Sequence, residues 1–177
     1  FYQVMVKRYS DFCNQQRGNK KIVGESTPAY VFHLDFIDSF YPNIKKICSI
    51  RDPKDKITSW HFSLLKKGRK TEREITEAFA MEYLRLRIVK EYQALLTYDK
   101  PVYCITYERM SGESHQTVRG LVEYLGMAAT DELIDSMVKN ASFEEMTRRH
   151  SKDTDTREPG EENLSDSLRK GIVGDWK

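Results

Sequence analysis

Long apolar runs are absent from this sequence of 177 residues. No stretch approaches the roughly 18 consecutive apolar residues that a helix needs to cross a bilayer. The first residues, Phe1-Tyr2-Gln3-Val4, also lack the charged and then apolar pattern of a secretory signal. We therefore expect no membrane span and a cytoplasmic location.

Cysteine is scarce: Cys13, Cys48 and Cys104 are an odd number and show no CxxC spacing. Cys48 and Cys104 lie inside apolar runs, so we expect buried, reduced core thiols rather than a disulfide framework or a zinc site. The four histidines show no metal-ligand spacing either. The sequence therefore predicts no metal ion.

An excess of charge of one sign is also missing, because 29 lysines and arginines stand against 27 aspartates and glutamates. This balance argues against nucleic acid as a partner, and it means that any anion site is local. With 39% hydrophobic and 32% charged residues, the composition is that of an ordinary globular domain. We expect one domain over residues 1–177, and the oligomeric state stays open.

Short β-like runs alternate along the chain with helical patterns, which predicts an α/β fold built on a mainly parallel sheet. We expect strands over residues 21–24, 44–50 and 102–107. We expect helices over residues 32–41, from Asp52 to about Leu65, from Thr71 to about Leu96, over 118–125, and from Thr130 to about Val138.

Two of the predicted helices begin with capping signals. Asp52-Pro53-Lys54-Asp55 places an aspartate at the cap, a proline at the first helical position and an acid at the third. Thr71-Glu72-Arg73-Glu74 has the form of a capping box. Residues 148–166 are polar and lack a hydrophobic period, so we expect a loop that orders over a ligand rather than a disordered linker.

The first candidate binding residue is Arg51, at the predicted carboxyl end of a buried strand and directly before a capped helix. Open α/β sheets bind ligands at this position, and the helix N-terminus adds partial positive charge. A guanidinium grips phosphate through two parallel hydrogen bonds, and Ser59 offers a hydroxyl donor about two turns along the helix. Taken alone, an Arg-Asp-Pro turn also fits a simple salt-bridged helix cap.

Arg169-Lys170-Gly171 is a second cationic element, in which two cations precede a glycine that permits close approach of the backbone. By itself, a basic pair near a terminus is often a solvated tail. Together, however, the two elements suit a small phosphorylated ligand better than a long polyanion.

The two elements resemble the nucleotide-binding half of the sulfotransferases that use 3′-phosphoadenosine 5′-phosphosulfate (PAPS). Arg51 and Ser59 match the spacing of an arginine and a serine that hold the 3′-phosphate in that family. Arg169, Lys170 and Gly171 match the family's second 3′-phosphate loop. The resemblance implies a P-loop-NTPase-like three-layer fold, in which helices flank a mainly parallel central sheet, incomplete in this chain. It also implies PAPS as co-substrate and no metal.

The same resemblance suggests contacts with the adenine. Tyr107 occupies the place of a tyrosine that reaches the base. Ser142 and Phe143 lie in a segment similar to the one that borders the base, and Phe143 is the stacking candidate. Without the resemblance, Tyr107 also fits a residue at a strand end and Phe143 a hydrophobic staple of a helix.

Residues 24–30 look like the segment that precedes the Arg-Asp-Pro strand in bacterial and glycan-modifying members of the family. Several of those members carry a lysine where this chain has Ser26, so no catalytic role is transferred to Ser26. Glu25, Thr27 and Tyr30 are candidates for the acceptor pocket. Thr27-Pro28 also fits the simple end of a short strand.

The largest departure from the family is the 5′-phosphosulfate loop, because no Gly-rich loop ending in Lys-Ser or Lys-Thr occurs in the sequence. We expect that loop and the catalytic residues upstream of Phe1, and further chain beyond Lys177, so that the single domain is truncated at both ends. Among the residues present, His33 and His61 fit structural or exposed roles better than that of a general base.

The resemblance implies in-line sulfuryl transfer from PAPS to a hydroxyl or amine of a small-molecule or glycan acceptor, whose identity stays open. Two alternatives remain. One is a nucleotide or small-molecule kinase of related fold, which uses ATP and magnesium. The other is a non-catalytic nucleotide-binding remnant that truly lacks the loop.

Overall fold

The computed structural model describes residues 7, 10–15, 18–19, 22–71, 74–150, 156–164 and 168–177. The chain divides into two compact units. Unit 1 comprises residues 1–44 and 93–99, and unit 2 comprises residues 45–92 and 100–177. Within the described ranges, no helix has the length and apolar character needed to cross a membrane.

Unit 1 contains the 3₁₀-helix η1 (Pro28–Phe32) and the helix α2 (Leu34–Phe40), which together cover the predicted helix over 32–41. The strand predicted over 21–24 is wrong in its described part, because residues 22–27 form neither helix nor strand. Ile22 and Val23 are 39% and 41% exposed. So short a segment forms a strand only where a neighbouring strand pairs with its backbone hydrogen-bonding groups. Lys21 lies outside the described residues.

The sheet of unit 2 consists, in the described residues, of two parallel strands, β1 (Ile47–Ile50) and β2 (Tyr103–Thr106). Ile47 lies opposite Tyr103, and Ile50 lies opposite Thr106. Both strands are shorter than predicted. The ladder pairs only Ile47–Ile50 with Tyr103–Thr106, and Tyr107 already begins a helix. The two strands are parallel, in agreement with the predicted mainly parallel sheet.

The cysteines are free, but they are less buried than predicted. Cys48 is half-buried and Cys104 is exposed, so the expected burial is wrong for Cys104. Side chains alternate between the two faces of a strand, and in β2 the buried face belongs to Ile105, next to Cys104.

Helix α3 (Pro53–Lys66) follows β1 and begins as the sequence predicts. The Asp52 carboxylate accepts a hydrogen bond from the Lys54 amide at 2.7 Å, and proline occupies the first helical position. Further along this helix, Trp60 stacks on Tyr83 with ring centroids 3.7 Å apart. The cap therefore fixes where the helix begins, immediately after Arg51.

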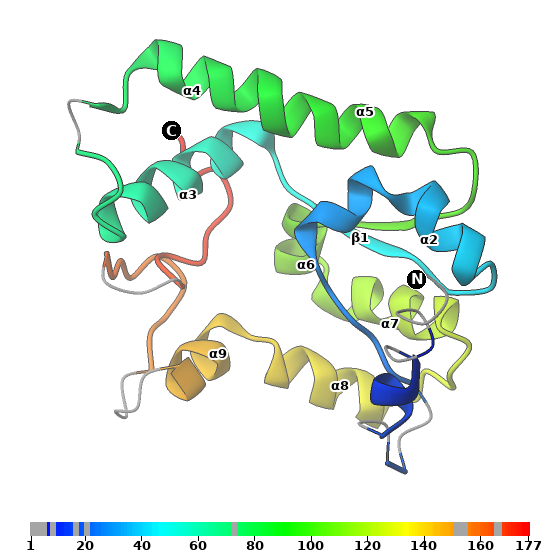
Figure 1. Ribbon diagram of the computed structural model, residues 1–177. Helices are drawn as coiled ribbons and strands as arrows, with labels where there is room; N and C mark the ends of the chain where they lie inside the picture. The colour runs from blue at the N-terminus through cyan, green and yellow to red at the C-terminus, as the bar shows by residue number, and fades with distance from the viewer. Residues whose placement is uncertain are drawn as a thin grey trace. The chain divides into compact units, whose positions relative to one another are not determined.

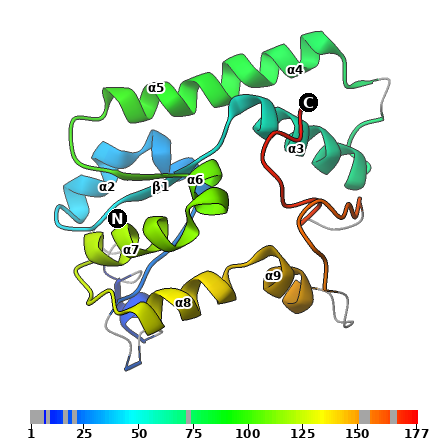
Figure 2. The ribbon, with the colours of Figure 1, turned by 180° about the vertical axis from the view of Figure 1, so that it is seen from behind.

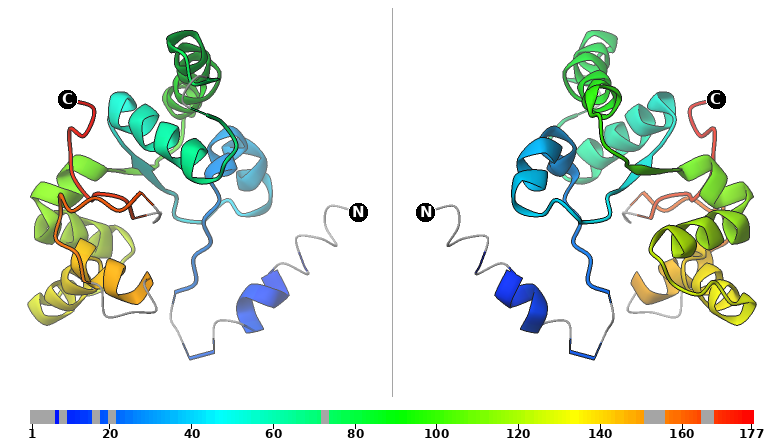
Figure 3. Two further views of the ribbon diagram at one scale, coloured as in Figure 1. Left: turned by 90° about the vertical axis from the view of Figure 1, so that its left-hand side faces the viewer. Right: turned by 90° about the vertical axis from the view of Figure 1, so that its right-hand side faces the viewer.

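Three helical segments follow without a break in the sequence. They are α4 (Glu77–Tyr83), the π-helical segment η3 (Leu84–Ile88) and α5 (Val89–Thr97), seen end-on in Figure 3. The predicted start at Thr71 is wrong. The Thr71 amide does donate to the Glu74 carboxylate at 2.7 Å, but the helix begins only after Thr76, whose hydroxyl accepts from Phe79 at 3.2 Å.

Four helices complete the described part of unit 2. They are α6 (Tyr107–Gly112), α7 (Ser114–Tyr124), α8 (Asp131–Asn140) and α9 (Phe143–His150). The second and third confirm the helices predicted over 118–125 and from Thr130 to about Val138. Helices α7 and α8 lie side by side (Figures 1 and 2) and bury Val118, Val122 and Ile134 between them. Segment 168–177, red in both views, runs beside α3. The polar loop predicted from residue 148 starts later, because α9 extends to His150.

Candidate functional site

A cavity of about 470 Å³ lies in unit 2 among α3, α6 to α9 and segment 168–177. All eight residues that the sequence suggested for nucleotide binding line it: Arg51, Ser59, Tyr107, Ser142, Phe143, Arg169, Lys170 and Gly171. Met110, Val118 and Val138 add apolar walls. The fold thus brings together the first cationic element, the second one and the two aromatic candidates.

Arg51 stands directly after β1, and its guanidinium is held from several sides. Nη2 donates to the Ile172 carbonyl at 3.1 Å and lies 3.6 Å from Oδ2 of Asp55. The guanidinium carbon lies 4.2 Å from the centroid of the Tyr107 ring, a cation–π distance. Tyr107 therefore supports Arg51 as well as lining the cavity.

The guanidinium of Arg51 is not fully used by these contacts. Its Nε is buried and has no hydrogen-bond partner among the described residues. Buried donors are nearly always paired, so an exception needs an explanation, such as a ligand. The backbone of Arg51 is fixed as well, since Tyr92 donates its hydroxyl to the Arg51 carbonyl at 2.8 Å.

Arg169 and Lys170 meet on one buried carboxylate. Asp175, whose side chain is 5% exposed, forms ion pairs with Arg169 and, at 3.0 Å, with the Nζ of Lys170. Arg169 also pairs with Glu162, and its guanidinium carbon lies 4.1 Å from the centroid of the Phe62 ring. The two cations are therefore held at the cavity wall and do not extend into solvent as a tail.

Gly171 is a position of this segment where a side chain would collide with a neighbour. Its φ is +68°, in the left-handed region. A Cβ built there would lie 2.4 Å from Cδ2 of Phe143, far inside van der Waals contact. The glycine therefore allows the backbone to pass directly against the aromatic ring.

Arg157, which the sequence did not suggest, binds the backbone of the second cationic element. It is only 7% exposed. Its guanidinium donates to the carbonyls of Leu168 at 2.8 Å and Arg169 at 3.1 Å. Its backbone amide donates to Oγ1 of Thr147, which is itself fully buried. Nothing local in the polar stretch around it distinguishes this arginine, because these partners are backbone carbonyls and a threonine ten residues away.

The described part of that stretch, residues 156–164, forms neither helix nor strand, as predicted. Residues 151–155 and 165–167 of the predicted loop lie outside the described residues. The Gly160 amide donates to the Lys170 carbonyl at 2.7 Å, and the Asn163 amide donates to the Arg169 carbonyl at 2.9 Å. The loop is thus tied to the cationic element by its backbone, whereas ordering over a ligand stays a prediction.

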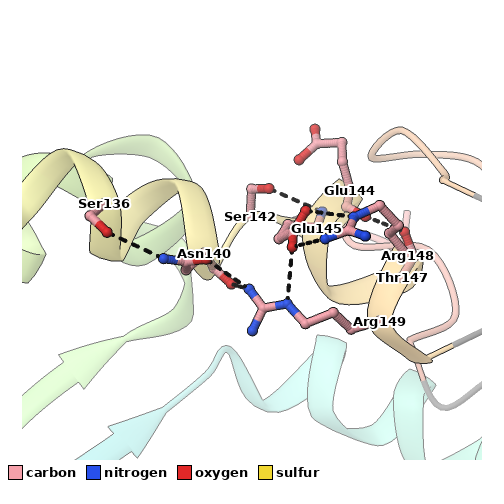
Figure 4. Close-up of polar contacts among 8 residues, drawn as sticks. All are labelled: Ser136, Asn140, Ser142, Glu144, Glu145, Thr147, Arg148 and Arg149. Atoms are coloured by element: carbon pink, nitrogen blue, oxygen red, sulfur yellow. Dashed lines mark hydrogen bonds and ion pairs between the residues drawn. The ribbon is translucent and has the colours of Figure 1, made fainter.

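Ser142 has a structural task at the start of α9, shown in Figure 4. Its hydroxyl accepts a hydrogen bond from the Glu145 amide at 3.2 Å, which is an N-terminal cap. The Glu145 carboxylate in turn accepts from Arg148 at 2.9 Å and from Arg149 at 3.1 Å. Hydrogen bonds and charge from Arg148, and then from Arg149, lower the pKa of Glu145 to about 2. Capping and this ion pair fix the helix that presents Phe143.

The neighbouring carboxyl also responds to the helix start. The pKa of Glu144 is lowered by a hydrogen bond from its own backbone amide and then by the Ser142 hydroxyl. Both effects stabilise the charged form at the positive end of α9. Glu144 lines the cavity, so the cavity carries negative as well as positive groups.

Ser59 is exposed and lines the main cavity together with Arg51. The two residues also line a smaller hollow of about 280 Å³ with Lys56, Trp60 and Ser63 among others. The Ser59 hydroxyl is therefore accessible from solvent, as expected of a group that donates a hydrogen bond to a ligand.

The acceptor-pocket candidates lie in unit 1. The Thr27 hydroxyl donates to the Glu25 carboxylate at 3.0 Å. A hydrogen bond with Glu25, followed by partial burial, raises the pKa of Tyr30 above its ordinary value. The three side chains thus form one polar cluster, and their role in acceptor binding stays a prediction.

Among the residues that the structure describes, no group of His, Cys, Asp and Glu is arranged to hold a metal ion.

Comparison with known proteins gives a consistent result. Residues 14–177 match the family described as the sulfotransferase domain. Sulfotransferase 1E1 of Bos taurus is 27% identical over 173 residues, covering 92% of this chain and 57% of the bovine protein. Sulfotransferase 1E1 of Cavia porcellus is 29% identical over 144 residues, covering 75% of this chain and 48% of that protein.

Solved structures share the fold. The crystal structure of mouse sulfotransferase SULT7A1 complexed with PAP matches with a TM-score of 0.55 and 26% identity, over 79% of this chain and 53% of that chain. This match confirms the predicted α/β fold of P-loop-NTPase type. The chain spans about half the length of the relatives that it matches.

Proposed function

This chain belongs to the sulfotransferase domain family, and we propose that it forms the part of a PAPS-dependent sulfotransferase that binds the nucleotide's 3′-phosphate and adenine. One observation carries the proposal: a single cavity is lined by all eight residues that match the family's nucleotide contacts. The SULT7A1 structure, which contains PAP, supports the same ligand class.

The charges of the cavity suit a phosphate. Arg51, Arg169 and Lys170 bring three cations to its wall, and the buried Nε of Arg51 has a hydrogen bond still to donate. Charge-assisted hydrogen bonds to phosphate are short and about twice as strong as neutral ones. We assign these three side chains and Ser59 to the 3′-phosphate, the group that distinguishes PAPS from ATP.

The size and the aromatic wall suit the rest of the nucleotide. A volume of about 470 Å³ lies within the roughly 300–1,000 Å³ typical of small-molecule sites. Phe143 offers a ring that is already backed by the Gly171 backbone. We assign Phe143, Tyr107 and Ser142 to the adenine side, with Gly171 permitting the close approach.

When bound, PAPS supplies the sulfuryl group, which passes to a hydroxyl or amine of a small-molecule or glycan acceptor. The residues of this cavity hold the far end of the donor and so fix its position and orientation. Correct placement of reacting groups alone contributes up to roughly 7–11 kcal/mol to well-oriented reactions. The catalytic group is not assigned to any residue of this chain. The acceptor role of Glu25, Thr27 and Tyr30, and a cytoplasmic location, stay predictions.

The test compares two nucleotides and one variant by calorimetry in the full-length protein. We expect 3′-phosphoadenosine 5′-phosphate (PAP) to bind clearly more tightly than ADP. Arg51→Ala should weaken PAP binding by roughly 1.5–3 kcal/mol and leave ADP binding nearly unchanged. Arg109→Ala is the matched control, because Arg109 on α6 is exposed, pairs with the neighbouring Glu113 and is not among the residues that line the cavity.

Each other outcome has a clear meaning. A preference of the wild-type protein for ADP with magnesium would favour the kinase alternative. Binding of neither nucleotide by the full-length protein would favour a non-catalytic remnant. An equal loss of PAP and ADP affinity in Arg51→Ala would assign Arg51 a structural role only.

A further inference from the structure

Asp55 is a buried carboxylate that the nucleotide contacts do not account for. It lies in the first turn of α3 and is 1% exposed. From the sequence alone, Asp55 is interpreted as an acidic residue that stabilises the positive N-terminal end of a helix. Such acids normally stay in water, because burying a carboxylate costs several kcal/mol unless it is well paired.

The contacts of Asp55 reach both cationic elements. Its Oδ2 accepts a hydrogen bond from the Gly174 amide at 2.9 Å. The same oxygen lies 3.6 Å from Nη2 of Arg51. That Nη2 also donates to the Ile172 carbonyl at 3.1 Å. Asp55, Arg51 and the backbone of residues 172–174 therefore form a closed set of contacts between the start of α3 and segment 168–177.

Two buried polar atoms of this set lack hydrogen-bond partners among the described residues, which is unfavourable if the set serves only to stabilise the fold. These atoms are Oδ1 of Asp55 and Nε of Arg51. An apolar side chain at position 55 would avoid the cost of a buried charge with one orphan oxygen. The arrangement makes sense if its task is to hold the guanidinium in one orientation and the second element at a fixed distance from it.

We propose that Asp55 is a positioning residue for the 3′-phosphate, which sets the geometry between Arg51 and the Arg169-Lys170-Gly171 element. The proposal rests on the proposed function, since it assumes that these elements bind the phosphate. Asp55 acts through the Arg51 guanidinium and through the Gly174 amide, and it does not itself touch the anion.

The experiment measures PAP and ADP affinity for the wild type and for Asp55→Asn in the full-length protein. Asparagine keeps an oxygen for the Gly174 amide and removes the charge that orients Arg51. We expect PAP affinity to fall by about tenfold, as for loss of one charged hydrogen-bond partner, while ADP affinity changes by less than about twofold. In Arg51→Ala/Asp55→Asn the loss should not exceed that of Arg51→Ala alone, because Asp55 acts through Arg51.

Asp52→Asn is the matched control. It removes a carboxylate from the same helix start, where Asp52 accepts from the Lys54 amide, and it should preserve the ratio of PAP to ADP affinity. A merely structural Asp55 would lower both affinities equally or add its effect to that of Arg51→Ala, and either result overturns the proposal. If the wild type itself prefers ADP, the proposed function fails and this proposal fails with it. If the wild type prefers PAP and Asp55→Asn retains that full preference, only the Asp55 proposal fails.

A second measurement holds even if Asp55→Asn does not fold. In the wild-type protein we expect the Gly174 amide to exchange with solvent slowly, because it donates to a buried carboxylate. PAP should slow this exchange further. Exchange of the Gly174 amide at the rate of an unprotected peptide, with or without PAP, would overturn the role of Asp55 between the two elements.

Discussion

Gly171→Ala tests whether close approach of the backbone to Phe143 holds the candidate site together. Two costs add at this position. The φ of +68° costs an alanine roughly 1–2 kcal/mol. The new Cβ would also lie 2.4–2.7 Å from three atoms of the Phe143 ring, whereas ordinary contact begins at 3.4 Å. The ring must therefore move by about 1 Å, and overpacking of this kind costs roughly 1–3 kcal/mol.

We expect Gly171→Ala to lower the free energy of unfolding by roughly 2–5 kcal/mol, a large part of the roughly 5–15 kcal/mol of a typical domain. Urea denaturation with an unchanged m-value measures this loss. Gly68→Ala is the control, because Gly68 has a similar φ of +59° and no described atom within 4 Å of the added Cβ. Gly68→Ala should cost only roughly 1–2 kcal/mol, the backbone part alone.

A double-mutant cycle isolates the collision. In a Phe143→Ala background the ring is gone, so Gly171→Ala should cost about as much as Gly68→Ala. PAP affinity should fall in Gly171→Ala and stay unchanged in Gly68→Ala, since Gly68 lies at the end of α3 away from the cavity lining. Equal losses of stability in Gly171→Ala and Gly68→Ala would refute the reasoning, because they would mean that the Phe143 ring does not limit the site.

Two further predictions concern helix ends in unit 2. The pKa of Glu145, lowered to about 2, lies below its ordinary value. Its contribution to stability is therefore complete above about pH 4.5 and is lost as the pH falls through about 2. Carboxyl NMR titration should find this low pKa in the wild type and a pKa closer to the ordinary value in Arg148→Ala. Thr130, whose hydroxyl accepts from the Leu133 amide at 3.3 Å, caps α8. Thr130→Ala should lower the free energy of unfolding by about 1 kcal/mol in urea titrations. Thr58→Ala, within α3, should change it by less than about 0.5 kcal/mol, and equal effects of the two substitutions would contradict the capping role.

Local signals in the sequence predicted local structure well. Asp52 and Thr130 cap the helices expected of them, because an N-cap involves only the next three residues. The box at Thr71 failed for a related reason: Thr71 does bind Glu74, but a second threonine five residues later caps the helix instead. A capping signal therefore predicts a turn more reliably than it predicts which of two neighbouring turns continues as helix.

The site was predictable only in part. The eight candidate residues, which line one cavity, could be predicted because they belong to short motifs that resemble those of a known family. Asp55 and Arg157 were missed as site residues, because their importance comes from partners far along the chain or from backbone atoms. Asp175 was missed as well, although its partner Lys170 lies in the same short segment. Burial of a charged side chain is a property of the whole fold, so no local pattern could have revealed it.

The contacts of Arg157 affect how freely the sequence of the loop around it, residues 156–164, can change during evolution. Its guanidinium recognises the carbonyls of Leu168 and Arg169, which every amino acid possesses. Mutational drift can therefore change side chains at the outer surface of this loop without weakening the grip of the arginine. In a library that randomises exposed positions such as Thr156 and Leu164, new surface properties should be obtainable with little loss of stability in the loop beneath them.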